Sequence, residues 1–258
     1  MNAHVFPGYP EPRTPLEHAA VAIGFHPRGL DELMRLGGWD AQRQAAEFDR
    51  EGWPERLRAD CVNREVVARL KPIGPEGARA LSAQECLAKI GCVKLRQAAA
   101  NYVAGAAVLL GKTGVGKTLA SLLMARRGAA AIERSRFEGT KLDRLETACS
   151  RNNRPQLPSV AWVSCAELPR LVSSQPFGRE PELLKQAKDA PLVVLDDLLW
   201  GDNDKALLEI LAHRYDHGLP SIATAGATRA ELVTRFGDAV VRRLLECRGV
   251  KGLVVEAF

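Results

Sequence analysis

The sequence has no long apolar run and no paired cysteines, and these two absences narrow the classes of protein that it can encode. No window approaches the roughly 18 apolar residues that a membrane-spanning helix needs. The N-terminus also lacks the basic segment and apolar run of a secretory signal. The six cysteines are scattered, with no CxxC pair and no His/Cys set at zinc spacing. We therefore expect no membrane contact, reduced thiols and a cytoplasmic location.

The charge balance is only mildly basic and leaves the partner open. Lysine and arginine total 36 against 31 aspartate and glutamate residues, which gives a net charge of +5. Nucleic acid is the usual partner of a strongly basic protein, but an excess this small neither requires nor excludes it. At 258 residues, the chain has room for one core domain of about 150–200 residues and an appendage.

The N-terminal part of the sequence predicts short helices. A proline-rich lead-in of about fifteen residues comes first. Apolar residues near helical spacing then predict helices at 30–36, with Gly37 and Gly38 as the stop, and at 55–70. Ser82 and Glu85 fit a capping box that opens a further helix, running to about Ala99. We interpret residues 1–95 as a helical region that binds a partner, although a small packed helical domain fits the same pattern.

From Val103 onward the sequence alternates between strand and helix patterns. Helices are expected from Lys117 and over 204–217. Apolar segments expected to form buried strands lie at 104–110, 160–165, 191–197, 221–226 and 252–258. This alternation predicts an α/β fold over residues 96–258, with a parallel sheet covered by helices on both faces.

A glycine-rich loop, GKTGVGKT, follows the first predicted strand and satisfies the pattern G-x-x-x-x-G-K-[ST]. Its glycines let backbone N–H groups point at phosphates, and the helix that follows adds its positive end. Lys117 supplies charge to the β- and γ-phosphates, and the Thr118 hydroxyl binds Mg²⁺. The predicted ATP-binding residues are Gly111, Lys112, Thr113, Gly114, Val115, Gly116, Lys117, Thr118 and Leu119.

Two acidic residues end the third predicted strand, in the segment LVVLDD. A carboxylate at the end of a buried strand can hold Mg²⁺ beside a nucleotide, which assigns Asp196 to the metal. The second acid, Asp197, can then orient and deprotonate an attacking water. An apolar strand that ends in Asp is common as a structural feature, but the preceding P-loop favours the functional interpretation.

The fourth predicted strand and a later helix add two further candidates. In some P-loop ATPases, an extra strand lies between the strand before the glycine-rich loop and the strand that ends in the acidic residues; these two are the Walker strands. The end of the extra strand presents a polar side chain to the γ-phosphate. In this sequence only Thr224 could supply such a side chain, and a buried threonine with a purely structural role is an equally good interpretation.

Arg242 and Arg243 lie in the amphipathic segment AVVRRLLE. Such a pair is usually solvated, but an arginine can also reach the nucleotide of a neighbouring subunit.

A basic stretch runs from Arg126 to Arg154, with eight Lys/Arg against four acidic residues. A basic loop at the edge of a sheet suits the phosphate backbone of a nucleic acid. A solvated insertion with alternating charge is the other interpretation, and it is favoured slightly because Phe137 is the only aromatic residue in the stretch.

Five segments resemble, in their order and spacing, the AAA+ ATPases of the DnaC/IstB type, which are replicative-helicase loaders and ATPase subunits of some transposons. The segments are YVAGAAVLLGKTGVGKTLA, AWVSCAELPRLV, LVVLDDL, LLEILAHRYDHGLPSIAT and RAELVTRFGDAVVRRLLE, within residues 96–250. The resemblance implies the parallel sheet of an AAA+ P-loop NTPase. It also implies that Walker A lies at 111–118 and that Walker B lies at Asp196 and Asp197.

The resemblance also implies roles for residues outside the two Walker motifs. Arg243 falls at the position of the arginine finger, and Arg214 falls on a family position. Gly226 stands where the family has its sensor 1 asparagine, so hydrolysis is expected to be slow unless Thr224 substitutes. The ATPase domain is expected to lack a C-terminal helical lid.

These implications lead to one main hypothesis and two alternatives. The main hypothesis is an ATP-dependent helicase loader of DNA replication, which grips single-stranded DNA and delivers a replicative helicase. It would bind ATP and Mg²⁺ between subunits of a homo-oligomer and hydrolyse ATP, with catalytic residues Lys117, Asp197, Arg243 and Thr224. One alternative is a transposition-helper ATPase that works on duplex DNA with a transposase. The other is a nucleotide-binding adaptor that does not hydrolyse ATP.

Overall fold

The computed structural model describes residues 70, 73–137, 158–174, 180–198, 204–247 and 249–258. The chain divides into two units, one made of Leu70–Glu133 and Leu157–Phe258, the other of Met1–Arg69 and Arg134–Gln156. All the described strands belong to the first unit. Three predicted features lie outside the described residues: the helix at 30–36, nearly all of the helix at 55–70, and residues 138–154 of the basic stretch.

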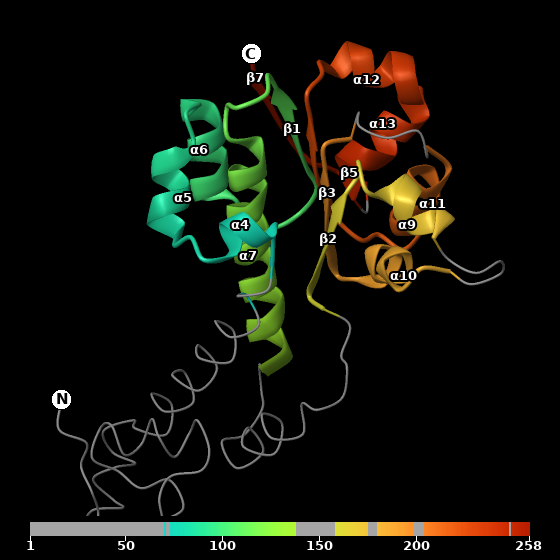
Figure 1. Cartoon of the computed structure of the whole chain (residues 1–258), viewed down its shortest axis with the longest axis horizontal. Helices are drawn as coiled ribbons and strands as arrows, with labels where there is room; N and C mark the ends of the chain where they lie inside the picture. Colours follow the sequence, from blue (N-terminus) through green and yellow to red (C-terminus); the bar gives the residue numbers. More distant parts are fainter. Residues whose placement is uncertain (1–69, 71–72, 138–157, 175–179, 199–203, 248) are drawn as a thin grey trace, which may run out of the picture. The chain divides into compact units, whose positions relative to one another are not determined.

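Five parallel strands form the sheet of this unit, in the order β2-β3-β4-β1-β7 (Figure 1). They are β1 (Ala107–Gly111), β2 (Val160–Ser164), β3 (Leu192–Asp196), β4 (Ser221–Ala225) and β7 (Leu253–Ala257). A short antiparallel ribbon, β5 (Glu246–Cys247) with β6 (Val250–Lys251), precedes β7. Because β4 lies between β1 and β3, the predicted extra strand between the two Walker strands is confirmed.

Helices cover both faces of the sheet, as the alternating pattern predicts (Figure 1). One face carries α4 (Glu76–Arg79), α5 (Ala83–Lys89), α6 (Val93–Asn101) and α7 (Lys117–Phe137). The other carries α9 (Leu168–Ser173), α10 (Glu182–Asp189), α11 (Asp204–Asp216), α12 (Arg229–Phe236) and α13 (Asp238–Leu245). No helix in the described part of the chain is long and apolar enough to cross a membrane.

Side chains of the strands alternate between the two helical layers. In β1, Ala107 and Leu109 pack with α7, whereas Val108 and Leu110 join the core on the α9–α13 face. A strand that is buried on both faces has no polar side to show in its sequence. This double burial explains why the predicted strands are uninterrupted apolar runs.

The helix predicted from Ser82 to about Ala99 is in fact two helices, α5 and α6. Its predicted capping box is confirmed: the Glu85 N–H donates to Ser82 Oγ at 3.2 Å, and the Ser82 N–H donates to the Glu85 carboxylate at 2.7 Å. After Lys89 the backbone leaves the helix, because Ile90 takes an extended conformation.

The break between α5 and α6 serves the glycine-rich loop. Ile90 is fully buried in the core on the α7 face. The backbone N–H of Cys92 donates to the carbonyl of Val115, in the loop, over 3.4 Å. This tertiary contact replaces the helical continuation that the apolar spacing predicts.

Residues 73–95 pack with the sheet, so the unit that contains the sheet begins before the predicted boundary at residue 96. Ile73 and Cys86 lie in the same buried core as β1 and α7. The Arg126 guanidinium on α7 donates to the carbonyl of Leu81 at 2.6 Å, which joins the α4–α5 turn to α7. The short helices α4–α6 provide the apolar cover that this face of the sheet needs, and helical periodicity alone cannot assign them to one unit or the other.

Candidate nucleotide-binding site

The glycine-rich loop joins the end of β1 to the start of α7, as its motif requires. Gly114 and Gly116 have φ angles of 85° and 98°, in the left-handed region that other residues rarely adopt. A Cβ on Gly111 would lie 2.4 Å from the Ala257 carbonyl oxygen, and one on Gly116 would lie 3.0 Å from Ile90 Cα. The loop therefore needs glycine to pass between β7 and the α5–α6 break.

Lys117 begins α7 and turns its side chain back onto the loop. Its ammonium group donates to the carbonyls of Gly111 at 2.7 Å and Lys112 at 2.8 Å, and the residue is only 8% exposed. Burial lowers the pKa of Lys117, and the nearby charges of Asp197 and Asp196 oppose that effect. An ammonium group has three donors, so these two bonds leave one N–H for a phosphate oxygen.

Three neighbouring elements bring hydroxyl and carboxylate oxygens together at the carboxyl edge of the sheet. Thr118, in the first turn of α7, donates to the Asp196 carboxylate over 3.2 and 3.3 Å to its two oxygens. Thr224, in β4, donates to Oδ1 of the same carboxylate over 2.7 Å. The structure thus brings together the two residues predicted to bind the metal.

The electrostatics of Asp196 suit a cation. Burial raises the pKa of Asp196, although hydrogen bonds from Thr224 and Thr118 act in the opposite direction. Hydroxyl and carboxylate oxygens are the ligands that Mg²⁺ prefers. The described residues include no group of three or more His, Cys, Asp or Glu that could hold a metal ion. Thr118 and Asp196 would therefore hold Mg²⁺ jointly with the phosphates of a nucleotide, as in other P-loop sites.

Asp197 follows β3 in an unusual backbone conformation. Its φ is 62°, in the left-handed region, which aspartate tolerates better than most residues. Its N–H donates to Thr224 Oγ1 at 2.9 Å, and the next N–H, of Leu198, donates to the Thr224 carbonyl at 2.9 Å. The charge of Asp197 also acts on Lys117, where it opposes the lowering of the lysine pKa by burial. The fold of this unit is that of an α/β P-loop NTPase.

Thr224 lies in a different environment from the one predicted for a phosphate contact. The side chain is 1% exposed, and its hydroxyl bonds both Asp196 and the backbone of Asp197. Gly226, by contrast, is exposed just past the end of β4, and a Cβ there would meet nothing within 4 Å. The end of β4 therefore has space for a polar side chain at position 226, and the sequence supplies none.

Arg243 lies away from the P-loop of its own chain. It is an exposed residue of α13, and its guanidinium carbon lies 5.8 Å from the centre of the Tyr215 ring. Tyr215 is in the last turn of α11, which leads to the start of β4. Arg243 is therefore at the amino side of the sheet, whereas Lys117 is at the carboxyl side. Its neighbour Arg242 is equally exposed.

Arg214 is a structural residue at the amino edge of the sheet. It is 1% exposed, and its guanidinium donates to the carbonyls of Ala187, Lys188 and Ala190 at the end of α10, to that of Pro220, and to Ser221 Oγ. Burial lowers the pKa of Arg214 to about 10, so it stays charged at neutral pH. The strands start at this edge, roughly 15 Å from their carboxyl ends.

Two arginines of the predicted basic stretch are used within the fold. Arg126 donates to the carbonyls of Leu81 and Arg79, and Arg127 donates to the carbonyl of Ala100. Both therefore attach α7 to neighbouring helices. DNA binding by the remaining basic residues, most of which lie outside the described residues, stays a prediction.

Sequence reasoning missed two neighbours of the site. One is Ile90, which packs against Gly116 beneath the loop. The Ile-Gly-Cys break within a helical pattern was the sequence feature that could have indicated it.

The other is Cys165, whose N–H donates to the Asp196 carbonyl at 2.9 Å. Burial first, and then the charges of Asp196 and Asp197, raise the pKa of the Cys165 thiol to about 12. This thiol is therefore unreactive at neutral pH.

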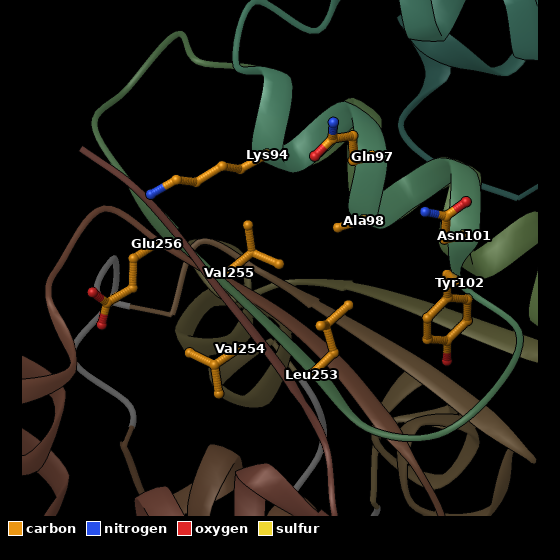
Figure 2. Close-up of a pocket in the computed structure, with 9 residues that line it drawn as sticks. All are labelled: Lys94, Gln97, Ala98, Asn101, Tyr102, Leu253, Val254, Val255 and Glu256. Carbon is orange, nitrogen blue, oxygen red and sulfur yellow. The ribbon is translucent and has the colours of Figure 1, made fainter.

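A separate pocket of about 650 Å³ lies between α6 and the edge strand β7 (Figure 2). Figure 2 shows side chains of α6, including Lys94 and Gln97, on one wall and Leu253 to Glu256 of β7 on the other. None of the predicted nucleotide-binding residues lines it. The site residues therefore belong to the loop and strand ends and not to this pocket.

No family model matches the chain, and no curated protein sequence matches it. Similar solved structures include the DnaC helicase loader, with 20% identity and a TM-score of 0.43, covering 64% of this chain and 87% of that chain. DnaI is similar at 18% identity and a TM-score of 0.42, with 64% and 78% coverage. A proposed primosome component from Streptococcus pyogenes serotype M3 is similar at 16% identity and a TM-score of 0.42, with 74% and 96% coverage.

The first of these structures is a DnaC protein, a name that the resemblance in the motifs also uses. At identities of 20% or less, these structures concern the fold alone. The function of this chain must therefore be argued from its own residues.

Proposed function

We propose that the chain binds ATP with Mg²⁺ and hydrolyses it to ADP and phosphate. The observation that carries this proposal is the meeting of the Lys117 ammonium group, the Thr118 hydroxyl and the Asp196 carboxylate at one edge of the sheet. Lys117 would bind the β- and γ-phosphates together with the backbone N–H groups of the loop. Mg²⁺, held by Thr118 and Asp196, would neutralise charge on those phosphates.

Asp197 is the residue that we assign to the attacking water. It lies next to the metal-binding carboxylate and near Lys117, with its backbone fixed by Thr224. Its carboxylate would orient the water and accept its proton. Asparagine also tolerates the left-handed conformation, so Asp197→Asn removes the base without adding backbone strain.

Arg243 would act on the nucleotide of a neighbouring copy in a homo-oligomer. Two observations support this role: Arg243 is exposed, and it lies at the opposite edge of the sheet from Lys117 of its own chain. Arg243 is therefore available to the nucleotide of another chain. An arginine supplied in this way stabilises the charge that develops in the transition state. ATP binding would then be coupled to assembly of the oligomer.

The cellular role that we propose is that of a helicase loader in DNA replication. Its support is the order and spacing of the five motif segments, which resemble the DnaC/IstB type. The chain would grip single-stranded DNA through the basic residues after α7 and hold a replicative helicase through its N-terminal region. A transposase with duplex DNA is the competing partner set.

One structural feature favours a second candidate, a nucleotide-binding switch with little turnover. The end of β4 presents Gly226, and the Thr224 hydroxyl is bonded to Asp196 and Asp197. Among the described residues of β4, no side chain is placed to polarise the γ-phosphate. Such a chain would bind ATP, change its affinity for a partner in response, and release the nucleotide slowly.

The experiment that tests these proposals is ATP turnover by the full chain, with and without single-stranded DNA. Wild type is compared with Lys117→Ala, Asp197→Asn and Arg243→Ala, and Arg242→Ala serves as the matched control for Arg243. We expect Lys117→Ala to lose nucleotide binding about 100-fold or more. Asp197→Asn should keep binding and lose about 10²- to 10⁴-fold in turnover. Arg243→Ala should lose about 10³-fold, while Arg242→Ala keeps turnover.

The outcomes separate the candidates. Turnover stimulated by DNA and lost in the three variants supports an ATPase with a shared site, and capture of a replicative helicase hexamer rather than a transposase supports the loader role. Tight ATP binding with no turnover under either condition supports the switch. Failure of wild type to bind any nucleotide would contradict both.

A further inference from the structure

Thr224 is bonded to the acidic pair in a way that leaves no hydrogen for a ligand. Its hydroxyl donates to Asp196 Oδ1 over 2.7 Å and accepts the Asp197 N–H over 2.9 Å. A hydroxyl has a single hydrogen, and phosphate oxygens only accept hydrogen bonds. Thr224 would have to release Asp196 before it could donate to a γ-phosphate.

The register of the sheet explains why these groups meet. Leu195 of β3 pairs with Ala223 of β4, so Asp196 and Thr224 are the next residues along the two neighbouring strands. Leu198 then donates its N–H to the Thr224 carbonyl over 2.9 Å. Thr224 therefore fixes the segment from Asp196 to Leu198 through three hydrogen bonds, one that it donates and two that it accepts.

This segment needs to be fixed because Asp197 is held at a φ of 62°. The left-handed conformation is disfavoured for a residue with a Cβ, so hydrogen bonds are needed to keep the segment in it. The hydrogen bonds at Asp197 N and Leu198 N flank the strained residue. On the other side of Asp196, Thr118 donates to the carboxylate that Thr224 orients.

We propose that Thr224 is a positioning residue, which aims the Asp196 carboxylate at the Mg²⁺ position beside Thr118 and holds Asp197 in its left-handed conformation, and that it makes no contact with phosphate. This role depends on the proposed nucleotide–Mg²⁺ site and adds to it the residue that couples the metal ligand to the base.

The test compares Thr224→Val, which keeps the branched shape and loses the hydroxyl, with Thr224→Ser, which keeps the hydroxyl. The readout is the Mg²⁺ concentration at half-maximal binding of a fluorescent ATP analogue to the full chain. Changes to a residue that orients a metal ligand typically cost about 10- to 100-fold in metal affinity. We expect a shift of that size for Thr224→Val, and Thr224→Ser should bind Mg²⁺ as wild type does.

A second comparison shows whether the effect acts through Asp196. In an Asp196→Asn background, Thr224→Val should shift the Mg²⁺ midpoint no further, because the oriented ligand has already gone. Thermal unfolding checks that the variants fold. If valine disturbs packing, Thr224→Cys keeps a side chain of similar size with a weaker donor, and it should give an intermediate shift.

The results that overturn the inference are distinct from those that overturn the proposed function. An unchanged Mg²⁺ midpoint in Thr224→Val and Thr224→Cys, with turnover alone reduced, would mean that Thr224 contacts phosphate. A shift of the same size in the Asp196→Asn background would mean that Thr224 acts elsewhere. Absence of nucleotide binding by wild type would reject the nucleotide site itself, and this inference with it.

Discussion

Lys117 at the carboxyl edge of the sheet and Arg214 at its amino edge are both buried basic side chains, yet their surroundings differ. Arg214 bonds carbonyls at the end of α10, the Pro220 carbonyl and the Ser221 hydroxyl through all three guanidinium nitrogens. Lys117 bonds two carbonyls of a glycine-rich loop and lies near Asp196 and Asp197. Burial lowers the pKa of both side chains.

The difference separates a cation that holds the fold together from one that can take a ligand. The partners of Arg214 are fixed parts of a helix end and a strand start, so a ligand could reach it only by unfolding them. Lys117 keeps one donor and faces residues that are themselves suited to a metal. Burial and a shifted pKa are therefore common to both residues, and the identity of the partners distinguishes their roles.

The largest expected effect tests the structural side of this comparison. Arg214→Met leaves several buried acceptors without a donor, so we expect it to lower the free energy of unfolding by at least about 3 kcal/mol. That loss corresponds to a fall in melting temperature of roughly 6–12 °C. Thermal unfolding measures it, with exposed Arg242→Met as the control. An unchanged melting temperature combined with lost turnover would place Arg214 in the active site.

The next effect tests whether the open end of β4 limits the chemistry. Gly226→Asn places an amide where a Cβ meets nothing within 4 Å, so the variant should fold. An added donor near the γ-phosphate should raise ATP turnover about 10-fold, a part of what a fully placed donor supplies. Gly226→Ala, which adds a side chain without a donor, is the control. Equal turnover in all three proteins would show that position 226 does not reach the phosphate.

The smallest effect concerns the stability of the metal-free site. The folded state raises the pKa of Asp196 above its ordinary value of 3.8, chiefly through burial, so ionisation of Asp196 costs the folded state free energy. The contribution of Asp196 to stability is fully present below its ordinary pKa, and it is lost as the pH rises through its pKa in the folded state. Without Mg²⁺ and nucleotide, Asp196→Asn should therefore melt at a higher temperature than wild type at neutral pH.

The pH dependence of that difference is its internal control. The gap in melting temperature between Asp196→Asn and wild type should shrink as the pH falls through the raised pKa of Asp196, because the wild-type carboxyl then takes up its proton. Added Mg²⁺ with nucleotide should favour wild type instead. A variant less stable than wild type in metal-free buffer would show that the hydrogen bonds from Thr118 and Thr224 outweigh the burial of the charge.

Much of the fold was predictable because buried parallel strands carry an unmistakable pattern. The apolar runs gave the five strands, and the glycine-rich motif predicted a loop between β1 and α7. The α5–α6 break was not predictable from periodicity, since Ile90 leaves the helix to support the loop. The start of the sheet-containing unit at Leu70 was missed for a related reason, because helices that pack on a sheet and helices of a separate domain share one periodicity.

The sequence by itself determined the glycine-rich loop and the residues that we propose for phosphate and Mg²⁺, because a P-loop is a local backbone shape set by consecutive residues. It also determined that Asp196 and Asp197 end a buried strand. Only the tertiary structure decided the roles of Thr224 and Arg214, since each is defined by partners on other strands or helices. The physical reason is that hydrogen bonds across a parallel sheet join residues far apart in the chain, and no local pattern records them.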